Sequence, residues 1–342
     1  MSERKPPILL TGIKTTGTPH LGNLAGAIAP AVAASRDPGV HAFYFLADYH
    51  ALISTWDPAA LARSTLEIAA AWLAFGLDPE RAVLYRQSDI PEIFELTWML
   101  SCLTAKGLMN RAHAYKAAVA ENEAAGLSDD PDRGITLGLY NYPVLMAADI
   151  LMFKANQVPV GRDQMQHLEM TRDIAARFNH HFGEHMVLPE ALVREETAVL
   201  AGLDGRKMSK SYGNIVPLFG SAKELRKLIF RIKTDSTPPE APKDPDTSTL
   251  YQIYRAFADA EQSRALAEDY RRGGIGWGEA KERLFELLDA LLAEPRERYA
   301  ELTAHPEKIE RILQEGAAKA RAVAKPYLVE LREAAGFKPL KR

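Results

Sequence analysis

The chain has 342 residues, which corresponds to two domains at roughly 150 residues per domain. Apolar residues make up 47% and charged residues 25%, as in ordinary globular proteins, and the net charge of −3 excludes a polycation. The single cysteine, Cys102, excludes an intramolecular disulfide and a multi-cysteine zinc cluster, and it fits a reducing compartment.

The first 215 residues alternate between short apolar runs and longer helical patterns. Residues 1–12 hold no apolar stretch long enough for a signal peptide or a membrane span, so we expect a cytoplasmic protein without membrane contact. The sequence predicts strands over 8–10, 41–47, 82–85 and 157–160, and helices from about residue 23, over 57–75, over 91–103 and over 164–178. Strands that alternate with helices predict an α/β fold with a mostly parallel, doubly wound sheet.

Two segments depart from this alternation. Residues 106–134 are polar and acidic, and we expect an insertion there that splits an α/β domain of residues 1–215. Beyond Pro217 a proline-rich loop at 237–246 is followed only by helical periodicity, which predicts an all-helical second domain over 216–342. The net charge is −5 for the first part and +2 for the second, so the second is the better candidate for a polyanion surface, with exposed positions such as Arg311 and Lys319.

A glycine-rich turn, TGIKTTGTPHLGN at residues 11–23, follows the first predicted strand and opens a helix. Glycines such as Gly17 and Gly22 let the backbone approach a ligand, and a helix N-terminus offers free N–H groups to phosphate. His20 lies just before the helix and can donate a hydrogen bond. An ordinary strand-to-helix turn would have the same composition, so this segment alone leaves both interpretations open.

A second segment, DGRKMSKSYGN at residues 204–214, places Lys207 and Lys210 three residues apart between Gly205 and Gly213. This pattern predicts a flexible basic loop, and taken alone it would also suit a solvated surface loop.

Together the two segments resemble the HIGH and KMSKS signatures of class I aminoacyl-tRNA synthetases. Residues 20–23 read HLGN, and residues 207–211 match the second signature letter for letter. Segments 142–151 and 158–179 are similar to the tryptophanyl-tRNA synthetases, and the similarity covers nearly the whole chain. It implies a Rossmann-like catalytic domain that joins L-tryptophan to ATP with release of pyrophosphate, and then transfers tryptophan to tRNA(Trp). It also implies that residues 216–342 bind the tRNA anticodon and that the protein is a homodimer.

The predicted amino-acid site includes three residues on one helical face. Tyr142, Met146 and Asp149 are spaced i, i+4 and i+7. An indole N–H is only a donor, so an ionised Asp149 suits it as a partner. From the residues alone, core packing is the favoured interpretation of Tyr142 and Met146. Asp149 could also be an N-cap or an ion-pair partner, and His50 a structural histidine.

The resemblance assigns further site residues. The tryptophan site would hold Tyr142, Met146, Asp149, His50, Val158, Val160 and Gln164, the last binding the amino group. The catalytic residues would be His20, Lys207 and Lys210. The ATP site would hold Lys14, Thr15, Thr16, Gly22, Asn23, Gly161, Arg162, Asp163, Val199, Lys207, Met208, Ser209, Lys210 and Ser211.

The expected chemistry needs no general base, because the attacking carboxylate is already ionised at neutral pH. Positioning and stabilisation of phosphate charge remain, with Mg²⁺ held by ATP rather than by a protein metal site. The chain departs from many family members at Lys14-Thr15, where they have Gln-Pro, and at Tyr212, where they have an acidic residue.

Two alternatives remain at this point: a tyrosine-specific enzyme of the same architecture, and a synthetase-like RNA-binding or regulatory protein without charging activity. The intact lysine loop argues against the second. Among the remaining residues, we expect Cys102 in the core and His180, His181 and His185 in a solvated turn rather than a metal site.

Overall fold

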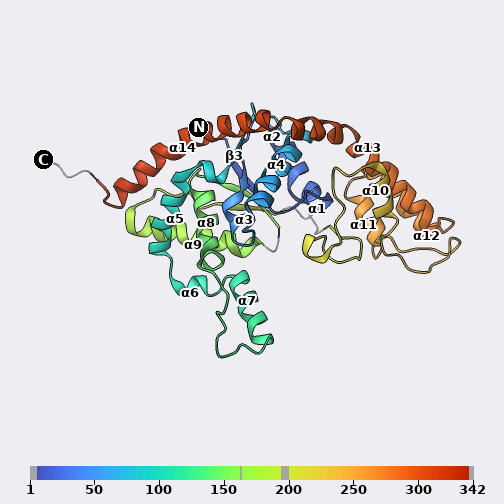
Figure 1. The fold of residues 1–342 in the computed structure, drawn as a ribbon, viewed down its shortest axis with the longest axis horizontal. Coiled ribbons are helices and arrows are strands. Elements are labelled where there is room, and N and C mark those ends of the chain that lie inside the picture. Colours follow the sequence, from blue (N-terminus) through green and yellow to red (C-terminus); the bar gives the residue numbers. More distant parts are fainter. Residues whose placement is uncertain (1–5, 162–163, 194–199, 339–342) are drawn as a thin grey trace, which may run out of the picture.

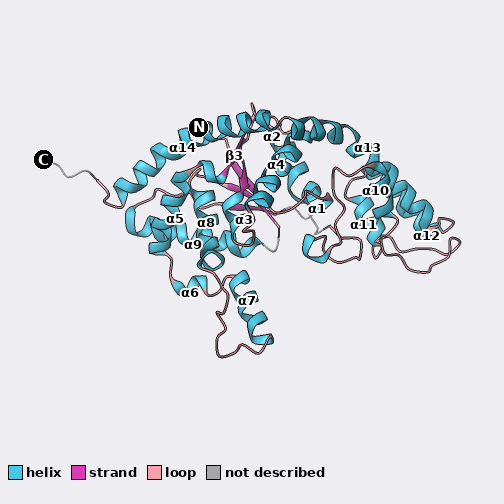
Figure 2. Cartoon of the chain, viewed as in Figure 1, coloured by secondary structure: helices cyan, strands magenta, loops and turns pink. Residues whose placement is uncertain are grey.

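The computed structural model describes residues 6–161, 164–193 and 200–338. Its described part contains one five-stranded sheet in which every pair of neighbouring strands is parallel. The sheet lies at the centre of the molecule with helices around it (Figures 1 and 2). The strand order is β3-β2-β1-β4-β5. The strands are β1 (Ile8–Lys14), β2 (His41–Ala47), β3 (Ala82–Arg86), β4 (Gln157–Val160) and β5 (Glu190–Val193). The predicted doubly wound parallel sheet is confirmed, and chain order reverses between β1 and β4, where such sheets bind ligands.

The sheet differs from the sequence prediction at two strands. β1 continues to Lys14, four residues beyond its predicted end, because the polar and glycine residues after Leu10 still pair with β2. β5, with the sequence EALV, was not predicted, since its residues do not alternate between polar and apolar side chains.

The helices of the first 215 residues follow the predictions closely. α5 has its predicted bounds, and Asp57 caps α4 by accepting a hydrogen bond from the Ala59 N–H at 2.9 Å. The first helix begins at Leu21, two residues earlier than expected, and continues through a π-helical stretch over Leu24–Ile28. The other elements are α2 (Ala29–Ser35), α3 (Asp48–Leu52), α4 (Pro58–Ala74), the 3₁₀ turn Gln87–Asp89, α5 (Pro91–Leu103), α8 (Leu137–Leu151) and α9 (Met165–Phe182), with α1 over Leu21–Asn23.

The segment 106–134 extends away from the body of the molecule (Figure 1). It contains α6 (Lys106–Met109) and α7 (His113–Ala124), and α7 has no buried residue. The expectation that Cys102 lies in the core is wrong, because it is exposed. The buried face of α5 carries Leu96, Met99 and Leu100, and Cys102 lies on the opposite side of that helix.

Helices make up the described regular structure of the second half: α10 (Ala222–Ile229), α11 (Thr249–Arg255), α12 (Ala260–Arg272), α13 (Trp277–Ala304) and α14 (Pro306–Ala334). The proline-rich loop before α11 is ordered around a buried cation. The ammonium of Lys243 donates to the carbonyls of Pro238 at 3.0 Å and Ala241 at 3.2 Å. Among the described residues no helix is both long and apolar enough to cross a lipid bilayer.

The last helix returns to the sheet. α14 lies against β3, and a Cβ on Gly316 would be only 1.8 Å from the Leu84 carbonyl oxygen, so glycine permits this close approach. Arg86 pairs with Glu310 through two hydrogen bonds of 2.8 Å. The ammonium of Lys319 donates to the Pro79 carbonyl at 3.0 Å, so this position faces the sheet domain. Residues 306–334 therefore cover an edge strand that would otherwise present unpaired backbone groups.

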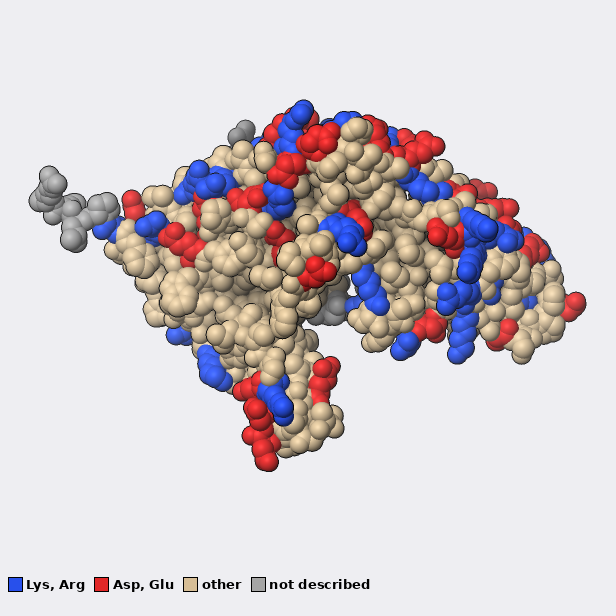
Figure 3. Space-filling view, in the orientation of Figure 1, with Lys and Arg blue, Asp and Glu red and all other residues tan. Residues whose placement is uncertain are grey.

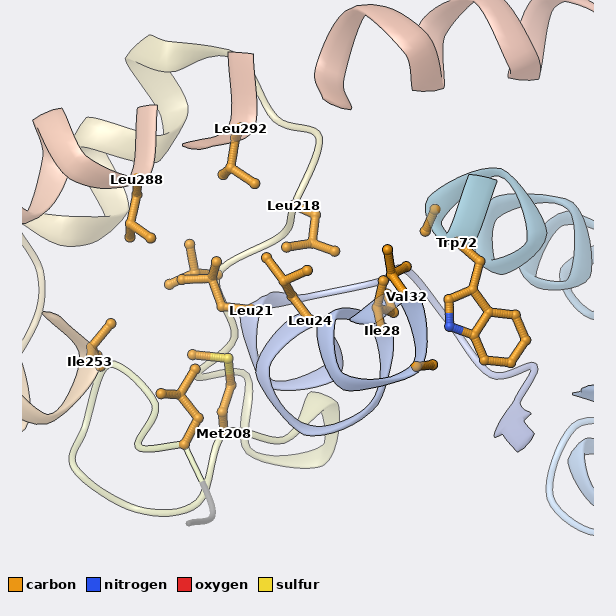
Figure 4. Packing of buried hydrophobic residues seen from close by; sticks show 14 of the residues in the cluster. Leu21, Leu24, Ile28, Val32, Trp72, Met208, Leu218, Ile253, Leu288 and Leu292 are labelled. Carbon is orange, nitrogen blue, oxygen red and sulfur yellow. The ribbon is translucent and has the colours of Figure 1, made fainter. Parts of the chain in front are cut away.

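Buried side chains form one core on each face of the sheet, as the alternation along strands requires. One core contains Leu9 and Tyr44, and the other contains Leu10 and Phe43. Figure 4 shows the first core, in which Leu21 and Leu24 of the N-terminal helices lie with Met208 of the lysine loop. This core joins the sheet domain to α11 and α13.

Candidate active site

The glycine-rich turn and the lysine loop meet through the segment that follows the loop. The Leu21 N–H donates to the Val216 carbonyl at 2.9 Å, and the Leu218 N–H donates to the Pro19 carbonyl at 3.1 Å. His20 is the N-cap residue of α1, and its own N–H donates to the Asn23 side chain at 3.1 Å. The two predicted motifs, far apart in sequence, therefore face each other.

Between them lies a polar cavity of about 470 Å³. Of the predicted ATP-site and catalytic residues, it is lined by Lys14, Thr16, His20, Gly22, Asn23, Gly161, Lys207, Met208, Ser209, Lys210 and Ser211. Thr15 lines neither this cavity nor the next, and its side chain is fully buried. The predicted Arg162, Asp163 and Val199 lie outside the described residues.

The electrostatics of the polar cavity suit an anion. Burial, together with the charge of Lys210, lowers the pKa of His20 to about 4, so His20 is neutral at physiological pH. Burial lowers the pKa of Lys210 to about 8, and its ammonium donates to the Thr16 carbonyl. Burial also lowers the pKa of Lys14. Polyphosphate oxygens would replace the water that the ammonium groups of Lys14 and Lys210 have lost on burial.

One amide organises the lysine loop, and sequence reasoning missed it. Asn214 is 3% exposed; its Nδ2 donates to the Lys207 carbonyl at 3.0 Å and to Asp204 at 2.7 Å. Its Oδ1 accepts from the Ser209 N–H at 2.8 Å. Asn214 is the last residue of the predicted loop segment 204–214, but its role depends on how that loop folds.

A second, more apolar cavity of about 540 Å³ lies beside the first. Every predicted tryptophan-site residue lines it: His50, Tyr142, Met146, Asp149, Val158, Val160 and Gln164. Ala114, at the start of α7, also lines it, so the inserted segment covers part of this cavity. Lys14 lines both cavities, and they therefore adjoin at its side chain.

Asp149 is the acidic group of the apolar cavity and is fully buried. Its carboxylate accepts from His50 Nε2 at 2.9 Å and from Gln87 Nε2 at 2.8 and 2.9 Å. Burial raises the pKa of Asp149, and the hydrogen bonds from His50 and Gln87 oppose that rise. His50 therefore lines the cavity and also has a structural partner. Gln87 had no signal in the sequence, because its partner is 62 residues away.

A second hydrogen-bonded group joins α8 to α9. The Tyr142 hydroxyl and His167 Nε2 are 2.5 Å apart, and His167 Nδ1 is 3.1 Å from Gln164 Oε1. Gln166, the residue before His167, accepts from the His113 N–H and donates to the Arg111 carbonyl, each at 2.9 Å. Gln166 thus holds the backbone between α6 and α7, within the inserted segment 106–134. Sequence reasoning missed both His167 and Gln166.

The histidines at the end of α9 form no metal site. His180 and His181 are exposed, as expected, but they lie in the last turn of α9 and not in a loop, because the helix continues to Phe182. His185 is half-buried, and its Nδ1 lies 2.8 Å from Glu330 of α14. Across the described part of the chain, no group of three or more His, Cys, Asp or Glu side chains could hold a metal ion.

A parallel sheet whose glycine-rich turn meets a KMSKS loop over one cavity defines a class I aminoacyl-tRNA synthetase. Residues 1–293 match the family model for class I tRNA synthetases of the tryptophan and tyrosine group. With the relatives described next, the chain belongs to this family and, within it, to the tryptophanyl-tRNA synthetases.

Similar proteins come from several bacteria. A tryptophan–tRNA ligase of Pseudomonas aeruginosa is 63% identical over 336 residues, which is 97% of this chain and 74% of the relative. One from Neisseria meningitidis is 56% identical over 97% of this chain and 98% of the relative. The crystal structure of the Campylobacter jejuni tryptophanyl-tRNA synthetase, complexed with ADP and tryptophan, has a TM-score of 0.84 and 44% identity, covering 96% of this chain and 99% of that one.

Proposed function

We propose that the apolar cavity binds L-tryptophan, that the polar cavity binds ATP, and that the two react where the cavities adjoin. The protein is a tryptophan–tRNA ligase: it forms tryptophanyl-adenylate and pyrophosphate, then transfers tryptophan to the 3′-terminal adenosine of tRNA(Trp). The observation that carries the assignment of the two cavities is the position of Lys14, which lines both. A carboxylate in one cavity and an α-phosphate in the other would meet beside this cation.

The polar cavity would act by positioning and by stabilising charge. Neutral His20 can donate a hydrogen bond to a phosphate oxygen, while Lys207 and Lys210 supply positive charge as pyrophosphate leaves. Among the described residues that line this cavity there is no carboxylate, so these donors suit phosphate rather than a metal ion. We therefore expect Mg²⁺ to enter with ATP, held mainly by phosphate oxygens and water, where it would neutralise charge.

The apolar cavity would select tryptophan through one acceptor for the indole N–H. An ionised carboxylate offers about four lone-pair sites, and His50 and Gln87 already use three of those of Asp149. The remaining site suits a single N–H donor. Met146, Val158 and Val160 offer apolar contacts to the rings, and Tyr142 with Gln164 would accept hydrogen bonds from the substrate ammonium.

We assign residues 1–215, interrupted at 106–134, to the catalytic domain and residues 216–342 to an anticodon-binding domain. The surface of α10 and the turn after it supports this assignment, because basic side chains gather there (Figure 3). The exposed cations are Lys223, Lys227, Arg231 and Lys233, besides Arg226, which pairs with Glu282. Such a cluster suits the phosphates of a tRNA. We also propose a cytoplasmic location for this enzyme.

We also propose a homodimer. Trp56 and Leu137 are 76% and 84% exposed, and they lie with Leu52 and Phe94 around an apolar groove of about 440 Å³. Trp98 is 72% exposed and lies one turn after Phe94 on the same side of α5. Large aromatic side chains exposed together mark an interaction surface rather than a solvated one. Sedimentation velocity should give a dimer for the wild type and a monomer for the Trp98→Glu variant; a wild-type monomer would refute this assignment.

ATP–pyrophosphate exchange with each of the twenty amino acids tests the assigned reaction. Exchange should require tryptophan. Exchange with tyrosine instead would support the tyrosine-specific alternative, and no exchange at all would support a binding protein without catalysis.

A further inference from the structure

We infer that His167 is a positioning residue that fixes the direction of the hydrogen bonds around the substrate ammonium. This inference rests on the proposed function, which assigns Tyr142 and Gln164 to that ammonium. His167 itself does not line the cavity. It is 4% exposed, and its ring nitrogens form hydrogen bonds with the Tyr142 hydroxyl and with Gln164 Oε1.

The hydrogen on each ring nitrogen follows from the acceptors around His167. Gln164 Oε1 can only accept, so the bond of 3.1 Å requires a hydrogen on His167 Nδ1. In a neutral imidazole, Nε2 must then be the acceptor, and the Tyr142 hydroxyl donates to it across 2.5 Å. The hydroxyl hydrogen is therefore directed away from the cavity.

Because the Tyr142 hydroxyl hydrogen points away from the cavity, two oxygen atoms remain as hydrogen-bond acceptors on the cavity side. The Tyr142 oxygen keeps its lone pairs, and Gln164 Oε1 keeps the second of its two lone pairs. An ammonium group has three donors and no acceptor, so it matches such a site. With the opposite tautomer, His167 Nε2 would donate to the phenol oxygen and the Tyr142 hydroxyl would present its hydrogen to the substrate ammonium. The buried histidine thus decides whether the cavity accepts or repels a cation.

The position of His167 on α9 supports this role. Gln164 is the N-cap residue of α9 and His167 lies three residues later, on the same side of the first turn. Tyr142 comes from α8, which packs against α9. One imidazole therefore links the two helices that carry the ammonium acceptors.

The test compares two ligands of the full-length enzyme, L-tryptophan and indole-3-propionate, which lacks the ammonium. The measured quantity is the ratio of their dissociation constants by calorimetry. Tyr142→Phe and Gln164→Ala should each lower the preference for tryptophan on the order of tenfold, the scale of one hydrogen bond to a charged group. If both variants keep the wild-type preference, the assigned ammonium site is wrong and the inference falls with it.

His167→Leu should lower the preference by a similar factor and change indole-3-propionate affinity much less. Because His167 acts through the other two residues, the double variant Tyr142→Phe/His167→Leu should lose little more than either single variant. His167→Gln, whose amide can accept from Tyr142 and donate to Gln164, should retain most of the preference. A merely structural role would weaken both ligands equally.

Thr171→Val is the matched control, since Thr171 is fully buried one turn further along α9 and its hydroxyl donates to the His167 carbonyl at 2.9 Å. This variant should lose stability without changing the preference. The inference about His167 is refuted, while the ammonium site stands, if Tyr142→Phe and Gln164→Ala behave as expected and either of two results is found for His167→Leu. One is that His167→Leu keeps the wild-type ratio of dissociation constants; the other is that its effect adds fully to that of Tyr142→Phe in the double variant.

Discussion

Replacing Asp149 with Asn should weaken tryptophan binding about 5- to 150-fold. The variant keeps the volume of the side chain but leaves one oxygen for three donors: His50, Gln87 and the indole N–H. An amide oxygen has two lone pairs, so at least one buried donor loses its partner. One unsatisfied buried polar group costs about 1–3 kcal/mol, which gives the stated range at 1.4 kcal/mol per tenfold change. The full burial of Asp149 means that water cannot compensate.

The assay compares L-tryptophan with its benzothiophene analogue, in which sulfur replaces the indole N–H. Dissociation constants for both ligands are measured on wild-type and Asp149→Asn enzyme. The wild type should prefer tryptophan, because only tryptophan donates to Asp149. The variant should lose most of that preference, whereas its affinity for the analogue should change less.

Met146→Leu serves as a control within the same cavity. It is an apolar exchange of similar volume, so it should shift both ligands by the same modest factor. If Asp149→Asn also shifts both ligands equally, then Asp149 supports the fold of the cavity and does not contact the indole N–H. That result would refute the assigned source of specificity.

Further predictions concern the lysine loop, His20, the basic helix and the close contact of α14. Because burial lowers the pKa of Lys210 to about 8, kcat/KM for ATP should fall as pH rises through 8, and Lys210→Arg should remove that decline. The same decline in the wild type and in the variant would exclude Lys210 as its cause. The pKa of His20 is about 4 in the folded protein against 6.5 in the unfolded chain, so the free energy of unfolding should decrease from pH 6.5 to pH 4, by at most about 3 kcal/mol from this group. Urea unfolding of His20→Gln should show a smaller decrease over this range, and an equal decrease would contradict the lowered pKa of His20. Reversing the charge at Lys223, Lys227 and Arg231 together should weaken tRNA charging but not pyrophosphate exchange. The control variant Arg63→Glu on α4 should change neither activity. If the folded triple variant loses both activities, these residues do not form a dedicated tRNA surface. Gly316→Ala should lower the free energy of unfolding by about 1–3 kcal/mol, because its Cβ would approach the Leu84 carbonyl, whereas Gly278→Ala on α13 has open space around it and should be neutral or stabilising.

Local signals account for what the sequence predicted well. An N-cap followed by proline at 57–58 sets the start of α4, and apolar runs bounded by turns set β2 and β3. The spacing of Tyr142, Met146 and Asp149 needs only helical geometry to place them on one face, and all three line the apolar cavity. Each of these inferences depends on residues within a few positions of each other.

Contacts between distant segments could not be predicted in the same way. Gln87 follows β3, and only the strand order places it beside Asp149 of α8. The charge balance of residues 216–342 suggested a surface that included Lys319. Lys319 is exposed as predicted, but α14 returns to the sheet and the ammonium of Lys319 donates to the Pro79 carbonyl. A count of charges along the chain carries no information about which helix faces which part of the fold.

The two halves of the chain also share the task of positioning the catalytic lysines. Met208, between the lysines in sequence, is 5% exposed and lies in one core with Ile253 of α11 and Leu288 of α13 (Figure 4). The backbone on either side of Pro217 pairs with the glycine-rich turn. Because apolar burial stabilises by about 25 cal/mol per Å², a buried methionine fixes the loop more firmly than its glycine-flanked sequence suggests. The helical half therefore contributes to the geometry of the polar cavity, although the described residues that line this cavity all come from the first 215 residues.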